Sequence, residues 1–296
     1  MKAFVTGVAS FLLLFFNTVI FVIPLMFIAL VKVLLRIGPI QHACSLSLTW
    51  IAETWATINK LIFATTTNTV WDVRGLGDLD KKHSYLVLAN HQSWVDIPAL
   101  LQTFTGRAPF FKFFLKKELI WVPLLGLAWW ALDYPFVRRY GKEFLKQNPH
   151  LKGKDLELTR KACEKFKTQP VSVMNFVEGT RFRADKHQKT QSPYRTLLKP
   201  KSGGIAFVLA AMGGQFESIL DVSIAYRDGE VPSFIDMLCG RIDRVIIDIQ
   251  HKPIPAYICA GDYSEDKAFR VEFQSWLNEI WQQKDERLIT LRQELN

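Results

Sequence analysis

The hydrophobic pattern of the chain begins with a long uncharged segment. No charged residue occurs between Lys2 and Lys32. As a helix this run would be about 43 Å long, which exceeds the hydrocarbon core of a bilayer, about 30 Å. Its length, and the absence of a small-residue cleavage site after it, argue against a secretory signal peptide. We expect residues 1–36 to be a membrane anchor, either a spanning helix or a re-entrant hairpin that turns back at Pro24.

Residues 37–66 carry a second, weaker apolar pattern. Apolar side chains recur at helical spacing, but Glu53 and Lys60 interrupt them. A charge at the centre of a bilayer costs about 2.5–3.5 kcal/mol even on the lenient scale. We therefore predict an amphipathic helix that lies at the membrane interface or packs on the protein, rather than a second span.

From residue 67 onwards the pattern changes to short strands separated by helices. Residues 84–89 and 171–177 are continuous apolar runs, typical of strands that are buried on both faces of a sheet. Further strands are expected at 67–74, 220–226 and 244–249, and a helix at 155–168. Strands that alternate with helices predict an α/β sheet domain, which we place at residues 67–262.

The C-terminal segment, residues 263–296, predicts an amphipathic helix. Ser264 is a suitable N-cap, and acidic residues follow it in the first turn. Apolar residues then fall on one helical face, namely Phe269, Phe273, Trp276, Leu277 and Ile280.

Composition and charge narrow the range of partners. The 296 residues include 37 Lys and Arg against 28 Asp and Glu, a formal net charge of +9, together with 22 Phe and 9 Trp. A basic chain implies an anionic partner, and the apolar, aromatic composition favours acidic lipid or a phosphorylated substrate over nucleic acid. The 4 cysteines are far apart and the 6 histidines are scattered. We therefore expect free thiols and no metal site.

A basic aromatic stretch lies before the middle of the chain. Phenylalanines at 110–114 are interleaved with Lys112, Lys116 and Lys117, and the uncharged run 119–132 follows. That run is too short to span a bilayer. The stretch is either an interfacial patch that binds anionic head groups or a buried core helix. Both interpretations apply if the run lines a tunnel for an acyl chain.

The residues with the clearest chemical potential follow the strand at 84–89. His91 and Asp96 stand five positions apart, a spacing that His150 and Asp155 repeat in a loop-like segment. Only the first pair follows a buried strand, and open α/β sheets bind ligands at the carboxyl ends of strands. Positions i and i+5 point about 140° apart on a regular helix, so the pair meets only if His91 lies in the strand-to-helix turn. Asp96 would then fix the imidazole tautomer and leave one nitrogen to accept a proton, unless His91 only caps the helix.

A second polar cluster ends the strand at 171–177. A glycine there lets the backbone approach a ligand closely, and a guanidinium is suited to phosphate. Taken alone, the cluster is equally typical of an ordinary salt-bridged turn. It consists of Glu178, Gly179, Thr180 and Arg181.

In order and separation, these motifs resemble the signature blocks of the 1-acylglycerol-3-phosphate O-acyltransferase (lysophosphatidic acid acyltransferase) family. The motifs are Asn90-His91-x-Ser93-x-x-Asp96, then Phe136-x-x-Arg139, then Phe176-x-Glu178-Gly179-Thr180-Arg181. The resemblance runs from about residue 71 to 230. It departs from the family pattern at Asp133, where glycine is usual, and in the fourth block, where a common proline is absent.

The resemblance implies a mixed sheet flanked by helices and transfer of a fatty acyl group from acyl-CoA or acyl carrier protein. The acceptor would be the free hydroxyl of 1-acylglycerol-3-phosphate, giving phosphatidic acid, or that of another lysophospholipid. His91 would be the general base and Asp96 would orient it, with no acyl-enzyme and no cofactor. Backbone N–H groups near His91 would meet the oxyanion. The residues implied to hold the phosphorylated glycerol are Arg139, Glu178, Gly179, Thr180 and Arg181, while Lys201 adds an anion contact or is an ordinary surface lysine.

The expected partners are thus an acyl thioester, a lysophospholipid and the membrane. Two basic residues follow the apolar run and one precedes it, which places the catalytic domain on the cytoplasmic face, at the cell inner membrane if the source is bacterial. A non-catalytic membrane scaffold is the alternative from a different functional class. Nucleic-acid binding and metal-dependent hydrolysis are disfavoured because the chain lacks their motifs.

Overall fold

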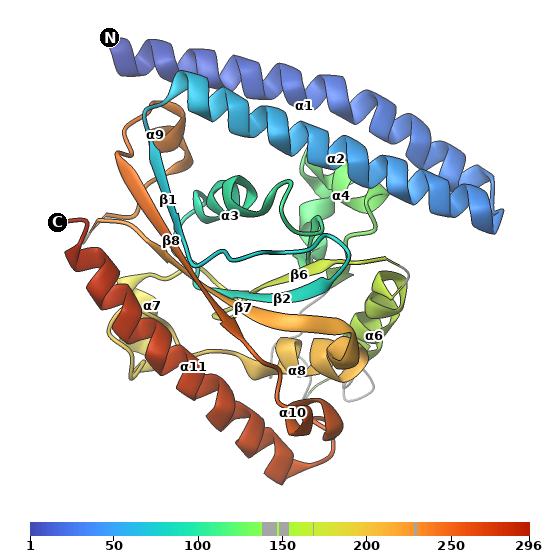
Figure 1. The fold of residues 1–296 in the computed structure, drawn as a ribbon, viewed down its shortest axis with the longest axis vertical. Coiled ribbons are helices and arrows are strands. Elements are labelled where there is room, and N and C mark those ends of the chain that lie inside the picture. The colour runs from blue at the N-terminus through green and yellow to red at the C-terminus, as the bar shows by residue number, and fades with distance from the viewer. Residues whose placement is uncertain (138–146, 148–153, 168, 228–229) are drawn as a thin grey trace.

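In the computed structural model, a mixed β-sheet lies between two layers of helices (Figure 1). The structure describes residues 1–137, 147, 154–167, 169–227 and 230–296. The predicted fold class, an α/β mixed sheet flanked by helices with an apolar N-terminal helix, is confirmed. The upper layer contains α1 (Lys2–Leu34), α2 (Gly38–Thr66) and α3 (Asp96–Phe104), and the lower layer contains α8 (Ser202–Met212) and α11 (Lys267–Gln293).

Within the described residues, six strands form the sheet in the order β1–β8–β7–β2–β6–β3. Strands β7, β2, β6 and β3 are parallel, whereas β8 runs antiparallel to β7 and β1 is parallel to β8. Ala89 of β2 lies opposite Phe176 of β6 and Val222 of β7, so these strands end at one edge of the sheet. The bounds are β1 (Val70–Arg74), β2 (Ser84–Ala89), β3 (Phe111–Phe113), β6 (Ser172–Phe176), β7 (Phe216–Ala225) and β8 (Arg244–Lys252).

Strand β2 is the central strand of two hydrophobic cores. Leu86 and Leu88 belong to the core that contains residues of α8 and α11, whereas Tyr85 and Val87 belong to the core that contains residues of α3. Every residue of β2 is buried, as the continuous apolar run predicted. Burial of Leu86, Val87 and Leu88 stabilises the fold by about 1.5–3 kcal/mol each, so the position of β2 is firmly fixed.

The basic aromatic stretch forms several short elements, of which one side is buried and the other is exposed. Ala128 and Ala131 are buried against α1 and α2, whereas Trp121 and Trp130 are exposed. The short elements of the described chain are β4 (Leu115–Lys116), η1 (Lys117–Trp121), α4 (Leu125–Ala131), β5 (Phe136–Val137), α6 (Lys154–Phe166), α7 (Ala184–Thr190), η3 (Gly213–Gln215), α9 (Phe234–Leu238) and α10 (Ala256–Ala260).

Helices α1 and α2 form an antiparallel pair (Figure 1). Helix α1 is long and apolar enough to cross a membrane. It continues through Pro24, so the re-entrant alternative, in which the chain turns back there, is wrong, and the reversal occurs instead at residues 35–37. Asn17 joins the two helices, because its amide nitrogen donates to Asn59 Oδ1 at 2.8 Å.

Helix α1 also contacts the sheet domain near both of its ends. Gly7 lies against Cys239, which follows α9, and Lys32 forms an ion pair with Asp133, which follows α4. About 38 Å of helix axis separates Gly7 from Lys32. Asp133 has a φ of 58°, a left-handed conformation that favours glycine. The carboxylate at this position therefore contributes a contact to α1 that a glycine lacks.

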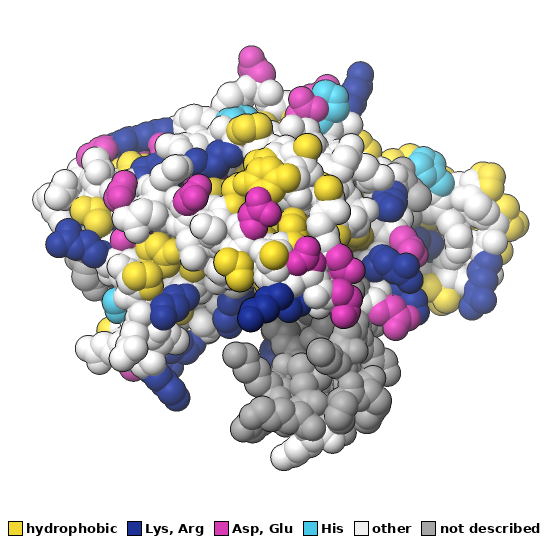
Figure 2. Space-filling model, turned by 90° about the horizontal axis from the view of Figure 1, so that it is seen from below, with side chains coloured by type: hydrophobic (Ala, Val, Ile, Leu, Met, Phe, Trp, Pro, Cys, Tyr) yellow, Lys and Arg dark blue, Asp and Glu magenta, His cyan; other side chains and the backbone are white. Residues whose placement is uncertain are grey.

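The face opposite the helix pair has a different character. Figure 2 shows basic and acidic side chains interspersed with small apolar patches on that face. On α1, by contrast, many large apolar side chains are exposed, among them Phe4, Phe11, Phe15 and Phe27. The exposed apolar surface is thus concentrated on one side of the molecule.

The C-terminal helix α11 begins slightly later than predicted. Asp266, rather than Ser264, is the N-cap and accepts hydrogen bonds from the backbone N–H groups of Ala268 and Phe269. The predicted apolar face packs below the sheet, where Phe273 and Leu277 are fully buried.

A buried lysine on α11 was not anticipated. The Lys284 ammonium lies 2.6 Å from Asp221 Oδ1 and donates to the carbonyls of Val222, at 2.5 Å, and Leu88, at 3.3 Å. Arg287 binds the other oxygen of Asp221 at 3.0 Å. Burial lowers the pKa of Lys284, and Asp221 opposes that shift. The lysine thus connects α11 to β2 and β7 just before their carboxyl ends.

Replacing Lys284 with methionine should lower the free energy of unfolding by about 3 kcal/mol. This is the lower end of the range for breaking a buried ion pair, because Arg287 still neutralises Asp221. The control is Lys267→Met, at the exposed start of the same helix, which should change stability by less than about 0.5 kcal/mol. Chemical denaturation in detergent micelles measures both variants, and equal stability losses would contradict the prediction.

Candidate functional site

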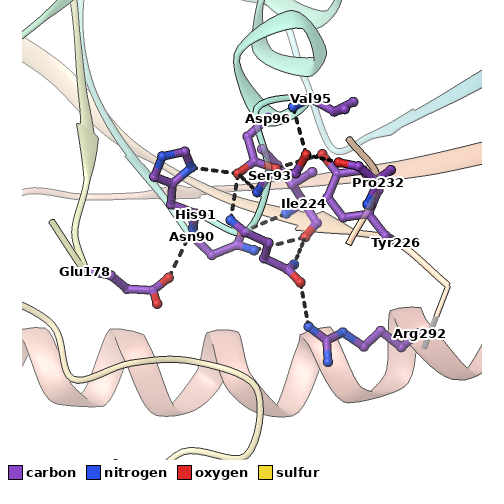
Figure 3. A network of polar contacts seen from close by, with 11 residues as sticks. Asn90, His91, Ser93, Val95, Asp96, Glu178, Ile224, Tyr226, Pro232 and Arg292 are labelled. Atoms are coloured by element: carbon purple, nitrogen blue, oxygen red, sulfur yellow. Dashed lines mark hydrogen bonds and ion pairs between the residues drawn. The ribbon is translucent and has the colours of Figure 1, made fainter. Parts of the chain in front are cut away.

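Polar residues that follow three parallel strands meet at one edge of the sheet (Figure 3). His91 follows β2, Glu178 follows β6 and Tyr226 follows β7. The parallel pairing of these strands brings the segments together although up to 135 positions separate them, as for His91 and Tyr226. This edge is where the sequence placed its two polar clusters.

The Asp96 carboxylate is the centre of the site. Its Oδ2 accepts hydrogen bonds from His91 Nδ1 at 2.7 Å and from the backbone N–H groups of Gln92, at 2.7 Å, and Ser93, at 2.9 Å. Its Oδ1 accepts from the Tyr226 hydroxyl at 2.7 Å. Asp96 opens α3 and is fully buried. The carboxylate thus orients the imidazole and also closes the turn that carries it.

These contacts determine the orientation of His91. Asp96 already accepts from the other donors, so Nδ1 must carry the proton in the neutral imidazole and Nε2 has a free lone pair. Within the part of the chain that the structure describes, Nε2 has no hydrogen-bond partner. The ring stacks on Phe176 with 4.0 Å between centroids, and the side chain is 16% exposed. His91 therefore offers a fixed, accessible base.

Several contacts hold the turn around His91 in place. Asn90 exchanges two hydrogen bonds with the backbone of Ile224 in β7. Arg292 of α11 donates to the side chain of Gln92 at 2.9 Å. The Ser93 hydroxyl donates to the carbonyl of Pro232. The turn is thus bound by β7, the C-terminal helix and the segment that precedes α9.

Glu178 braces the turn from the β6 side. One of its oxygens accepts the His91 N–H at 3.1 Å, and the other accepts the Leu198 N–H at 3.0 Å. Only 1% of Glu178 is exposed. Burial raises the pKa of Glu178 to about 8; the two N–H donors and the Lys284 charge oppose this shift, and Asp96 adds to it.

The turn after Glu178 presents a cation. Gly179 has a φ of 67°, which explains the need for glycine at this position. The Arg181 guanidinium lies over the Trp94 ring, 4.5 Å from its centroid. No ion pair occupies Arg181 among the described residues, whereas the neighbouring Arg183 is paired with Asp185. The stacked guanidinium therefore keeps its N–H donors available for an anion.

Not every expected site residue lies in this cluster. Arg139 is outside the described residues, as is His150 of the second histidine–aspartate pair. Lys201 is exposed, and its backbone N–H donates to Val177. Thr180 accepts a hydrogen bond from Lys186 at 2.6 Å. In the described chain, no group of three His, Cys, Asp or Glu side chains is arranged to hold a metal ion.

Four backbone N–H groups near His91 already have partners within the protein. The backbone N–H groups of His91, Gln92, Ser93 and Val95 are bound to Glu178, Asp96, Asp96 and the Ser93 hydroxyl, respectively. They hold the turn together and have no donor left for a reaction intermediate. Of the expected oxyanion donors, these four are therefore engaged in the turn itself.

Three residues of the site escaped the sequence analysis. Tyr226 and Lys284 were read only as part of a strand and of a helix, and Trp94 only as a variable position within a motif. No local pattern marks such residues, because their partners are distant in sequence. A polar residue at the end of an apolar strand, as Tyr226 is, was the one available signal.

Comparison with known proteins connects this arrangement to a family. The sequence model of a family described as acyltransferase matches residues 70–227. The chain is 25% identical over 243 residues to the 2-acyl-1-lysophosphatidylinositol acyltransferase of Saccharomyces cerevisiae, covering 69% of this chain and 60% of that protein. It is 24% identical over 257 residues to the 1-acyl-sn-glycerol-3-phosphate acyltransferase delta of Homo sapiens, covering 83% and 61%. The chain therefore spans about three fifths of the length of these relatives.

A solved structure has the same fold. The crystal structure of the 1-acyl-sn-glycerophosphate acyltransferase PlsC from Thermotoga maritima aligns with a TM-score of 0.52 at 18% sequence identity. The alignment covers 95% of this chain and 98% of that chain. The fold, including the helices before the sheet, is therefore shared.

The raised pKa of Glu178 predicts a pH-dependent stability. Its ordinary pKa is near 4.5, so between about pH 4.5 and 8 the folded protein holds a proton that the unfolded chain has released. Stability should fall as pH rises through this window, by at most about 1.4 kcal/mol per pH unit, and level off above it. Glu178→Gln should lack this contribution.

Urea denaturation of both proteins from pH 5 to 8 measures the difference between their slopes. Glu272→Gln, an exposed position on α11, should follow the wild-type slope. Parallel slopes for the wild type and Glu178→Gln would show that Glu178 is ionised throughout.

Proposed function

The chain belongs to the acyltransferase family, and from this premise we propose that it transfers a fatty acyl group from an acyl thioester to the free hydroxyl of a lysophospholipid. The proposed acceptor is 1-acylglycerol-3-phosphate and the product is phosphatidic acid. The observation that carries the proposal is the 2.7 Å contact between His91 Nδ1 and Asp96. It leaves Nε2 free at a sheet edge that also holds the stacked Arg181.

His91 acts as the general base. A hydroxyl is a weak nucleophile at neutral pH, so Nε2 takes its proton while the oxygen attacks the thioester carbonyl carbon. The tetrahedral oxyanion then expels the thiolate, which takes the proton from the imidazolium. Asp96 stabilises that imidazolium through the Nδ1 hydrogen bond, and Tyr226 holds the other oxygen of Asp96. No acyl-enzyme is formed.

The acceptor phosphate binds at the turn that follows β6. Arg181 is the principal contact, because a guanidinium forms paired hydrogen bonds with phosphate oxygens. Gly179 and Thr180 bring the backbone of this turn close to the glycerol, and Arg139 and Lys201 add positive charge. Glu178 has a supporting role in this turn, because its two oxygens accept hydrogen bonds from the backbone N–H groups of His91 and Leu198.

Acyl-CoA and acyl-acyl carrier protein both carry the acyl group as a thioester, so either can be the donor. Their thiol is a good leaving group, so the site needs no acid to protonate it before departure. We propose residues 67–262 as the catalytic domain, with residues 263–296 as a C-terminal helix that buttresses its sheet.

The helix pair attaches the enzyme to the membrane, with residues 1–36 as the anchor and residues 37–66 at the interface. Contacts of α1 with the sheet domain at Gly7 and Lys32 favour a helix that lies along the domain. A helix that crossed the bilayer alone would lose one of these contacts. We place the catalytic domain on the cytoplasmic side, following the basic residues that end α1.

A panel of lysolipids with labelled acyl-CoA and acyl carrier protein tests the function. Lysophosphatidic acid should be the preferred acceptor. Preference for lysophosphatidylinositol would instead assign a remodelling role, like the activity that the yeast relative's name states. Absence of transfer to every acceptor would favour a non-catalytic scaffold.

His91→Ala in the same assay should lower turnover by about 10²–10⁴, the usual contribution of a general base. The control is His83→Ala, which alters an exposed histidine outside the site and should keep the wild-type rate. A His91→Ala enzyme that retains most of its rate would exclude this residue as the base.

Arg181→Ala should raise the KM for lysophosphatidic acid at least about tenfold, because a charge-assisted phosphate contact is lost. The KM for the acyl donor should change far less. Arg183→Ala is a matched control, since its guanidinium already pairs with Asp185. Equal changes in both KM values would argue against a phosphate role for Arg181.

A further inference from the structure

An exposed apolar group lies next to the site but takes no part in it. It consists of Val231, Phe234 and Ile235, in and just before α9, and is termed the α9 lip below. Their exposed fractions are 59%, 41% and 63%, respectively. Apolar residues that cluster at a surface, rather than occurring singly, indicate a site of contact with another apolar phase.

The lip continues the apolar surface of α1. Gly7 of α1 lies against Cys239, and Thr6 lies close to Gly240, so the N-terminal end of α1 packs beside the end of α9. Phe4 and Phe11 of α1 are exposed there as well. Helix α1 has the length and composition of a membrane helix, so a lipid phase around its N-terminal end would also reach the lip.

The lip is also connected to the catalytic turn. Pro232 lies between Val231 and Phe234, and its carbonyl accepts the hydroxyl of Ser93. The backbone N–H of Ser93 in turn donates to Asp96. Two hydrogen bonds therefore separate the backbone of the lip from the carboxylate that orients His91.

The backbone of this segment is prepared for an apolar environment. Ser233 and Asp236 form a capping box, in which each side chain accepts the other residue's backbone N–H. Arg241 neutralises Asp236 at 3.0 Å. The N–H groups of Ser233 and Asp236 are thus satisfied internally and the Asp236 charge is paired, which lowers the cost of bringing this segment close to hydrocarbon.

We infer that the α9 lip inserts into the membrane leaflet beside α1 and holds the mouth of the site at the lipid surface. The occupant is a lipid leaflet rather than a protein, because the lip is continuous with the exposed face of a membrane-type helix. The expected benefit for the lipid acceptor rests on the proposed function, whereas insertion itself does not.

Photo-cross-linking tests insertion without any need for activity. The full-length protein is bound to phosphatidylglycerol vesicles that contain a phospholipid with a diazirine in its acyl chain, and the adducts are mapped on tryptic peptides. We expect adducts on the α1 peptide 3–32 and on peptide 228–241, which carries the lip. Peptide 271–284 of α11 is the control, because it carries the exposed Val271, at 64%, and because α11 lies across the sheet from α1 in Figure 1.

Three results would overturn insertion. The first is a set of adducts on α1 with none on peptide 228–241, and the second is equal labelling of peptide 228–241 and peptide 271–284. Absence of adducts on every peptide would also overturn it, because the inference requires contact of this face with lipid.

A variant then tests the benefit for catalysis. The triple substitution Val231→Ser, Phe234→Ser and Ile235→Ser should raise the KM for lysophosphatidic acid in vesicles about tenfold, while leaving turnover of a short-chain, monomeric acceptor within about twofold of wild type. Leucine at the same three positions should restore the vesicle KM. Val271→Ser is the control and should change neither value.

Equal losses on both acceptors would show that the lip only supports packing, and an unchanged vesicle KM would show that it has no role in delivery. Either result overturns the catalytic benefit. Failure of the proposed function is a distinct outcome, in which the wild-type enzyme itself transfers no acyl group to either acceptor.

Discussion

The buried carboxylate of Asp96 is the interaction on which the site depends. It accepts hydrogen bonds from an imidazole, two backbone N–H groups and a phenol. A buried carboxylate is costly unless its oxygens are satisfied, and here the donors come from both the β2 turn and β7. Orientation of the imidazole and closure of the turn thus depend on the same carboxylate.

The C-terminal helix α11 holds the strands and the turn around His91 in place. Lys284 binds the carbonyls of Leu88 and Val222, and Arg292 binds Gln92, so α11 contacts both strands and the turn between β2 and α3. Glu178 provides the corresponding support from β6. Breaking any one contact leaves a buried polar group unpaired, which costs more than the bond itself contributes. The geometry of His91 therefore depends on residues of α11 and β6 as well as on its own turn.

The two faces of the molecule differ in their exposed apolar surface. Exposed phenylalanines lie along α1, whereas the face opposite carries charges of both signs (Figure 2). Because α1 contacts the domain near Gly7 and again at Lys32, the helix cannot reorient without breaking packed contacts. An acceptor that remains in the leaflet would therefore meet the sheet edge in a constant orientation. This fits a reaction whose acceptor and product are both lipids.

The sequence by itself determined the α/β class, the buried strands such as Ser84–Ala89, the apolar helix and the two polar clusters. The class, the strands and the helix follow from the local spacing of apolar residues, and the two polar clusters follow from their position directly after predicted strands. It did not determine that α1 continues through Pro24, that Asp266 caps the last helix, or that Glu178 is fully engaged by backbone N–H groups. Tyr226 and Lys284 became site residues only through parallel strand register and helix packing, which join positions 130 and 62 apart in the chain to their partners Asp96 and Val222. Such contacts leave no local pattern, because a hydrogen bond between distant segments depends on where the whole sheet places them.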